Sequence, residues 1–381
     1  MPEKTLYALV EPDYASSVWF MKSLAGLRHA AARRKVAIRL SGSARELEEL
    51  LDLRTFVLIA SDSEWTSFLV SQMRERGVRA VLMGPTPNDF GPDVSGALIN
   101  REALVGDMVR YFCSCGRTRL ASLGYEANLV NDGVRRHAFV SAAREYRLAV
   151  EETRDVYDLN GSLDHCISRF FENVSLYDGV LCTNDYIACR LIAEAGERGV
   201  RVPEELFVAG SGNLLVGSCA SPTLTTSTLD YYEMGVQTLG LWSLIEENAN
   251  VVSAGVTIPY KIIPRGSTAF LPIPGNATPQ SLPAPSYGMA RDASLMWLRR
   301  LEACLMRCDA LDFALIAGVL GEKSTQELAE KCFISPGTVQ YRLRKLYAAV
   351  DASDRAEFAR RLKPYIANLE ALQKEKSPPR S

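Results

Sequence analysis

The chain has 381 residues, 47% of them apolar, and a formal net charge of −2. This length suits two or three globular domains, and no apolar run approaches the ~20 residues that a membrane-spanning helix needs. Nine cysteines without a CxxC pair, and three histidines remote from them in sequence, argue against a metal site and favour free buried thiols.

Short apolar segments alternate with amphipathic segments through the first two thirds of the chain. The expected strands are residues 5–10, 36–40, 56–60, 79–83, 97–99, 119–123, 148–152, 179–182 and 207–209, and the expected helices are 14–34, 44–52, 64–76, 102–115, 130–146, 162–173 and 184–198. This alternation predicts parallel sheets covered on both faces. The strand count favours two similar α/β lobes. No basic and apolar leader precedes the first strand, so we expect a cytoplasmic protein.

Motifs in this region resemble those of the LacI/GalR family. They are Asn184-Asp185 after a strand, RGVRVPEELFVAG at 198–210, PTLTT at 222–226, EMG at 233–235 and RGST at 265–268. The resemblance covers about residues 4–268. It implies a two-lobed, periplasmic-binding-protein-like (type I) α/β domain that closes over a small-molecule effector, such as a sugar or a similar polar metabolite.

Family topology implies lobe one at about 1–116 and 230–248, and lobe two at about 117–228 and 250–268. In that family the DNA-binding domain precedes this body. Here the first strand begins near Thr5, so the DNA-binding part is expected at the other end of the chain.

The resemblance also implies ligand contacts between the lobes. Arg135 matches a ligand-facing arginine, whose guanidinium can hold a hydroxyl pair or a carboxylate; a surface arginine is the alternative. Asn184 matches a polar contact at the carboxyl end of a strand, although capping the next helix is equally natural. Asp13 and Trp19 flank the first strand–helix loop, and Trp19 either stacks on a ligand or belongs to the core.

One position departs from the sugar-binding pattern. Residues 210–213 read Gly-Ser-Gly-Asn, and Gly212 occupies the place of a family aspartate. A glycine has no side chain that could accept hydrogen bonds from sugar hydroxyls. The ligand is therefore of another kind, is held by Asn213, or does not exist. A phosphate loop is not expected, because no G-x-G-x-x-G context surrounds these glycines.

A second region follows a break in composition. Residues 269–288 include five prolines and predict an exposed linker. Residues 289–375 predict a helical domain, and 376–381 a tail. Leucines recur at helical spacing from Leu295 to Leu305, so this first helix needs a partner, either the rest of its own domain or a second copy of the chain. Residues 289–381 carry 16 Lys and Arg against 12 Asp and Glu, whereas residues 1–288 carry 27 against 33, which suits a mildly basic nucleic-acid module on an acidic body.

Residues 324–350 predict a helix-turn-helix. Ser324 and Glu327 have capping-box spacing, and Ser335-Pro336 is a helix start. Phe333 and Ile334 are expected to fill the turn. The second helix buries an apolar stripe, and its other side suits the DNA major groove. The expected DNA-binding residues are Pro336, Gly337, Thr338, Gln340, Tyr341, Arg344 and Lys345.

The segment STQELAEKCFISPGTVQYRLRKL, with Arg355-Ala356-Glu357 further on, resembles the DNA-binding domain of LuxR-type regulators. The two resemblances together predict a cytoplasmic, ligand-responsive and dimeric transcriptional regulator that contacts DNA but no membrane. The alternative is a DNA-bound scaffold that responds to a protein partner, with a degenerate effector cleft. Because no Ser/His/Asp set, metal cluster or nucleotide loop is legible, we expect neither enzymatic activity nor a cofactor.

Overall fold

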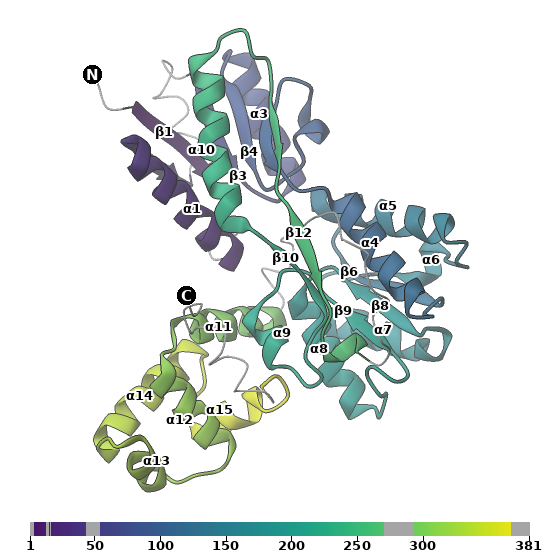
Figure 1. Cartoon of the computed structure of the whole chain (residues 1–381), viewed down its shortest axis with the longest axis vertical. Coiled ribbons are helices and arrows are strands. Elements are labelled where there is room, and N and C mark those ends of the chain that lie inside the picture. The colour runs from purple at the N-terminus through teal and green to yellow at the C-terminus, as the bar shows by residue number, and fades with distance from the viewer. Residues whose placement is uncertain (1–3, 13–14, 16, 43–53, 270–292, 367–381) are drawn as a thin grey trace.

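The computed structural model describes residues 4–12, 15, 17–42, 54–269 and 293–366. Figure 1 shows two α/β lobes joined by crossing strands, with a helical domain at the C-terminal end. Among the described helices, none combines the length and apolar content that crossing a membrane requires. The predicted helix at 44–52 and the linker lie outside the described residues, as does almost all of the last predicted helix, 365–374.

Lobe one is built on a six-stranded parallel sheet in the order β11-β5-β4-β3-β1-β2. Its strands are β1 (Lys4–Val10), β2 (Val36–Ser41), β3 (Thr55–Ile59), β4 (Arg79–Met83), β5 (Ser95–Leu98) and β11 (Gly255–Thr257). Its helical elements are α1 (Val18–Arg34), α3 (Ser63–Glu75), α10 (Tyr231–Glu247) and the 3-10 turn η2 (Pro87–Phe90). β3 is buried along its whole length, as expected for a central strand covered on both faces.

Two glycines allow α1 and α10 to pack backbone against backbone. A Cβ atom on Gly26 would lie 1.8 Å from the carbonyl oxygen of Tyr232, and one on Gly235 would lie 1.8 Å from that of Ser23. No larger residue fits at either position without separating the helices.

Lobe two is built on a four-stranded parallel sheet in the order β7-β6-β8-β9. Its strands are β6 (Leu120–Tyr125), β7 (Val156–Asp158), β8 (Gly179–Cys182) and β9 (Phe207–Ala209). Its helical elements are α4 (Arg101–Ser114), α5 (Val130–Glu145), α6 (Glu152–Asp155), α7 (Leu163–Glu172), η3 (Val174–Leu176), α8 (Asp185–Glu197) and α9 (Leu215–Cys219).

An antiparallel pair of strands, β10 (Thr226–Leu229) and β12 (Tyr260–Ile263), runs between the lobes, and the turn η4 (Gly266–Thr268) follows. The lobe limits differ from those that the family topology implied. α4 packs on α5 of lobe two, and β11 joins the sheet of lobe one. The strand expected at 148–152 is also wrong, because β7 begins only at Val156 after the short helix α6.

The C-terminal domain contains α11 (Ala293–Arg307), α12 (Ala310–Leu320), α13 (Thr325–Cys332), α14 (Pro336–Ala349) and α15 (Arg355–Leu362). The helical stretch expected from 289 to 320 is divided near Asp309, whose capping box with Asp312 starts a new helix. α11 buries its leucines against α8 and α9 of lobe two, α1 of lobe one, and α14.

Candidate sensor cleft and nucleic-acid interface

Local hydrogen bonds fix both helices of the predicted helix-turn-helix. The backbone N–H of Glu327 donates to Ser324 Oγ at 3.2 Å, and that of Ser324 donates to Glu327 Oε2 at 2.6 Å. The backbone N–H of Thr338 donates to Ser335 Oγ at 3.1 Å, and Pro336 is the first residue of α14. The predicted capping box and helix start are therefore present.

α14 presents one buried and one exposed side. Val339, Leu343 and Leu346 are buried, as is Val350 just beyond the helix. The residues predicted to bind DNA are all exposed and form what we call the exposed α14 face, composed of Pro336, Gly337, Thr338, Gln340, Tyr341, Arg344 and Lys345. Polar and cationic side chains on such a face can reach base edges and phosphates.

Phe333, in the turn before α14, does not fill the turn as expected. Its side chain is 95% exposed, and its backbone is left-handed, with φ of 55°. It forms the C-cap of α13, where its backbone N–H bonds to the carbonyl oxygens of Ala329 and Glu330. Ile334, by contrast, is partly buried and packs on the core.

The cationic side chains of α14 are of two kinds: Arg342 is held by ion pairs within the domain, whereas Arg344 and Lys345 are exposed. Arg342 Nη1 lies 2.8 Å from a carboxylate oxygen of Asp309 and 2.8 Å from one of Asp312, so it ties α14 to the start of α12. The Lys345 ammonium lies 4.6 Å from the centre of the Tyr341 ring, a cation–π contact that orients both side chains. Among the described residues, Arg344 forms no ion pair.

In lobe two, Arg135 of α5 is buried and paired with a neighbour on its own helix. Its Nη1 is 2.7 Å from Asp132 Oδ1. It lines, with Ser122, Tyr125 and Thr183, a cavity of about 30 Å³. That volume holds a water molecule or two and is far below the roughly 300–1,000 Å³ of ligand pockets.

Asn184 caps α8, a role that is compatible with ligand contact. Its Oδ1 accepts hydrogen bonds from the backbone N–H groups of Tyr186 and Ile187, at 3.0 and 3.2 Å, and its side chain is buried.

Asp185 was not among the predicted site residues. Its carboxylate links α8 to β10 and to the residues that follow β9. Its carboxylate accepts from Thr226 Oγ1 at 2.5 Å and from the backbone N–H of Leu214 at 2.7 Å. Burial raises its pKa to about 6, although these hydrogen bonds act in the opposite direction. Its place beside Asn184 at the end of a strand was the available signal.

Trp19 is fully buried between the lobes, in the core position that the sequence left open. Its ring packs edge-on against Tyr186 of lobe two, with 5.9 Å between ring centres. Gly212 faces it, since a Cβ there would lie 3.4 Å from Trp19 Nε1. Asn213 Oδ1 accepts from Arg265 at 2.7 Å, so this side chain is engaged within the protein. Asp13 lies outside the described residues.

The lobes also contact each other through Asn128 of lobe two. Asn128 Nδ2 donates to Asp62 Oδ2 at 3.0 Å, and the backbone N–H of Ser63 donates to the Asn128 carbonyl oxygen at 3.1 Å. The two lobes therefore contact each other through Trp19 and through Asn128.

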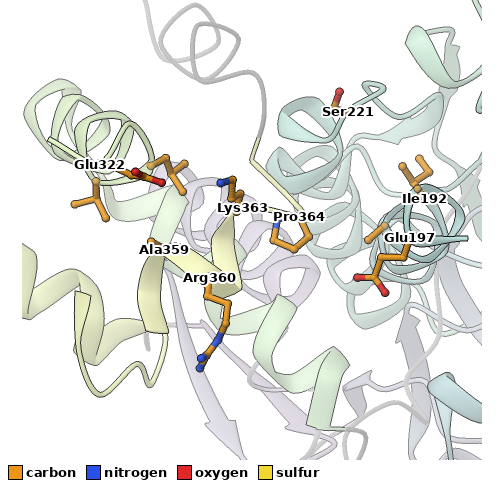
Figure 2. Close-up of a pocket in the computed structure, with 12 residues that line it drawn as sticks. Ile192, Glu197, Ser221, Glu322, Ala359, Arg360, Lys363 and Pro364 are labelled. Carbon is orange, nitrogen blue, oxygen red and sulfur yellow. The ribbon is translucent and has the colours of Figure 1, made fainter. Parts of the chain in front are cut away.

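A larger cavity, of about 730 Å³, lies between lobe two and the C-terminal domain. Figure 2 shows Ile192, Glu197 and Ser221 on one side of it, and Arg360 of α15 with Lys363 just after that helix on the other. Its walls carry charges of both signs. The two domains leave a cavity here, whereas α11 contacts α8 and α9 of lobe two.

Comparisons with known proteins agree with this geometry. Residues 109–268 match the family of periplasmic binding protein-like domains, and residues 321–349 match a winged helix-turn-helix DNA-binding family. The chain is 23% identical over 160 residues to the HTH-type transcriptional repressor PurR of Haemophilus influenzae, a match that covers 40% of this chain and 47% of that protein. It is 22% identical over 276 residues to catabolite control protein A of Priestia megaterium, covering 69% and 82%.

Among solved structures, a cellobiose complex of the transcriptional regulator CelR superposes with a TM-score of 0.61 at 17% identity, covering 70% of this chain and 84% of that one. The fold is thus a type I periplasmic-binding-protein-like α/β domain followed by a helical domain with a helix-turn-helix. The chain spans about half the length of the PurR relatives it matches. The finer prediction of a LuxR-type domain is not supported, since the matching family is a winged one.

Proposed function

We propose that this chain is a DNA-binding transcriptional regulator in which the two-lobed domain binds a small polar molecule and thereby repositions the helix-turn-helix. The exposed α14 face carries this proposal. It combines an amide, a phenol, a guanidinium and an ammonium on one side of a helix whose other side is buried. Gln340 and Arg344 are assigned to base edges, and Lys345 to phosphate.

A sugar or a related metabolite is the proposed effector class, because CelR, a structural relative, is known in complex with cellobiose. The chain is proposed to act as a homodimer, so that closure of two lobe pairs changes the spacing of two helix-turn-helix units. An effector with about 100-fold higher affinity for one lobe arrangement would supply roughly 2.7 kcal/mol for this change.

Replacing Arg344 with Ala tests the assignment. Duplexes that the full chain selects from a random pool provide the target. We expect the variant to bind them about 1–3 kcal/mol more weakly, because a guanidinium contact to a base is lost. Affinity is read by fluorescence anisotropy at a fixed salt concentration. Arg33→Ala, an exposed arginine at the far end of α1, is the matched control and should bind as the parent does. Equal affinity of Arg344→Ala and the parent would show that the reading face is misassigned.

A second candidate is a regulator that responds to a protein partner and has no small effector. The buried Trp19, the missing carboxylate at Gly212 and the cavity of about 30 Å³ at Arg135 favour it. These three features leave little room for a sugar at the positions that the family resemblance implies.

A further inference from the structure

The helix α11 lies between the cleft region and the proposed DNA-reading helix. It contacts α1 of lobe one, α8 and α9 of lobe two, and α14. An ion pair of 2.5 Å between Arg300 and Asp351 adds a link to the residues that follow α14. Because α11 contacts both lobes and α14, a shift of α11 changes the position of α14 relative to the lobes.

A single buried carboxylate on α11 bonds to the two-lobed domain. Glu302 is 1% exposed. Its Oε1 accepts from the backbone N–H of Leu215 at 2.9 Å, and its Oε2 accepts from that of Val216 at 3.0 Å. Burying a carboxylate is costly unless such donors satisfy it, so the side chain holds α11 to a defined place on lobe two.

The residues that Glu302 contacts belong to a segment anchored by the strands between the lobes. This 210–216 segment leaves β9 at the cleft edge. The backbone N–H of Gly212 donates to the Ser227 carbonyl oxygen of β10 at 2.9 Å. Arg265, just after β12, holds Asn213, and Asp185 accepts from the backbone N–H of Leu214. Successive residues of the segment thus bind the crossing strand β10, the turn after β12, α8 and finally α11.

We propose that Glu302 is a positioning residue that couples the 210–216 segment, and with it the strands crossing between the lobes, to α11 and the DNA-reading helix. The consequence for DNA rests on the proposed function, whereas the coupling itself can be measured without DNA. A rotation of the lobes displaces the amides of Leu215 and Val216 or carries α11 with them. Leaving the carboxylate buried without donors is the costly alternative, so the two movements are linked.

The charged and titratable groups around Glu302 give the coupling a dependence on pH. Lys22 faces it from α1, and Asp185 and Cys189 face it from α8. Burial raises the pKa of Glu302 to about 7, while the two amides and Lys22 lower it and Asp185 raises it. Because an undocked, solvated glutamate ionises near pH 4.5, docking of α11 is strongest below that pH, weakens as pH rises from there towards 7, and levels off above 7.

Hydrogen exchange of the full chain, read by mass spectrometry, tests the coupling. In Glu302→Ala the amides of Leu215 and Val216 lose their acceptor, and we expect their exchange to become about 10- to 100-fold faster. Glu302→Gln keeps one carbonyl oxygen as an acceptor and should lie closer to the parent. Glu172→Gln, an exposed acid on α7, is the matched control and should exchange as the parent does.

A pH series separates coupling from simple packing. After correction for intrinsic exchange rates, protection of residues 213–219 in the parent should fall between about pH 5 and 7 and then level off. In Glu302→Gln that part of the pH dependence should be absent, although Asp185 still titrates in both proteins. Unchanged exchange in Glu302→Ala, or an unchanged pH profile in Glu302→Gln, overturns the proposal. Binding of sheared duplex DNA at low salt is measured in parallel. If even the parent chain does not bind, the proposed function fails, while the exchange data still decide the role of Glu302.

Discussion

Arg342 and Arg344 are two positions apart on α14 and have different surroundings. Arg342 is bonded to Asp309 and Asp312, while Arg344 is exposed and forms no ion pair with any described residue. The sequence places both on a helix whose charged residues are all cationic but does not say which one is held by α12. That distinction depends on where α12 starts, and the capping box at Asp309 was not foreseen.

Asp185 gives a pH-dependent contribution to stability that can be measured. Its pKa is raised by burial to about 6, above the value of about 3.9 expected in an unfolded chain. The unfolded chain therefore ionises first as pH rises from 4, and stability falls by about 3 kcal/mol until pH passes 6. Urea unfolding of Asp185→Asn should lack this part of the pH dependence. A parent-like slope between pH 4 and 6 would contradict the assignment.

The candidate site could be predicted only in part at the level of single residues. Asn184 was expected at the carboxyl end of a strand, where it lies. The exposed α14 face was expected from helical periodicity and caps. Trp19 was placed near the cleft, yet its burial depends on Tyr186, whose proximity the sequence does not reveal. The pairing of Arg135 with Asp132 could have been read from their i,i+3 spacing on the predicted helix. Glu302 was missed because one acid on an amphipathic helix looks like a solvated residue until its neighbours from lobe two are known.

At the scale of elements, the alternation of apolar strands and helices was sufficient to predict the parallel sheets. It could not assign α4 and β11 to their lobes, because the choice depends on which sheet edge and which helix surface are still uncovered. α4 has apolar residues such as Met108 and Phe112 that pack into the core of lobe two. β11 is only three residues long, too short for a pattern.

The contact of α1 with α10 predicts a sharp contrast between two glycines. Gly235→Ala places a Cβ atom where Ser23 O already lies, and we expect it to lower the free energy of unfolding by more than about 2 kcal/mol. Gly106→Ala, in α4, meets nothing within 4 Å and should raise it by up to about 1 kcal/mol. Chemical denaturation compares the two variants. Equal effects would show that the helices can separate at no cost.

At the scale of the whole molecule, the contacts between the lobes bear on the choice between the two proposed functions. A thermal-shift screen of sugars, nucleosides and amino acids discriminates between them. A true effector raises the free energy of unfolding by about 2.7 kcal/mol at 100 times its Kd. The melting temperature therefore rises with effector concentration. Arg135→Ala should abolish this shift if the effector binds between the lobes. A complete screen without any shift would favour the protein-partner alternative.

The pairing of β11 with β5 has a consequence for biosynthesis. The ribosome releases β1 to β5 first, then all of lobe two up to β9, and only afterwards α10 and β11. Until then β5 is an unpaired edge strand of the nascent first sheet, and α1 lacks its contact with α10. The N-terminal lobe is thus the later of the two to be completed. Stalled or truncated chains that end before residue 257 should expose β5 as an edge strand and be prone to aggregation.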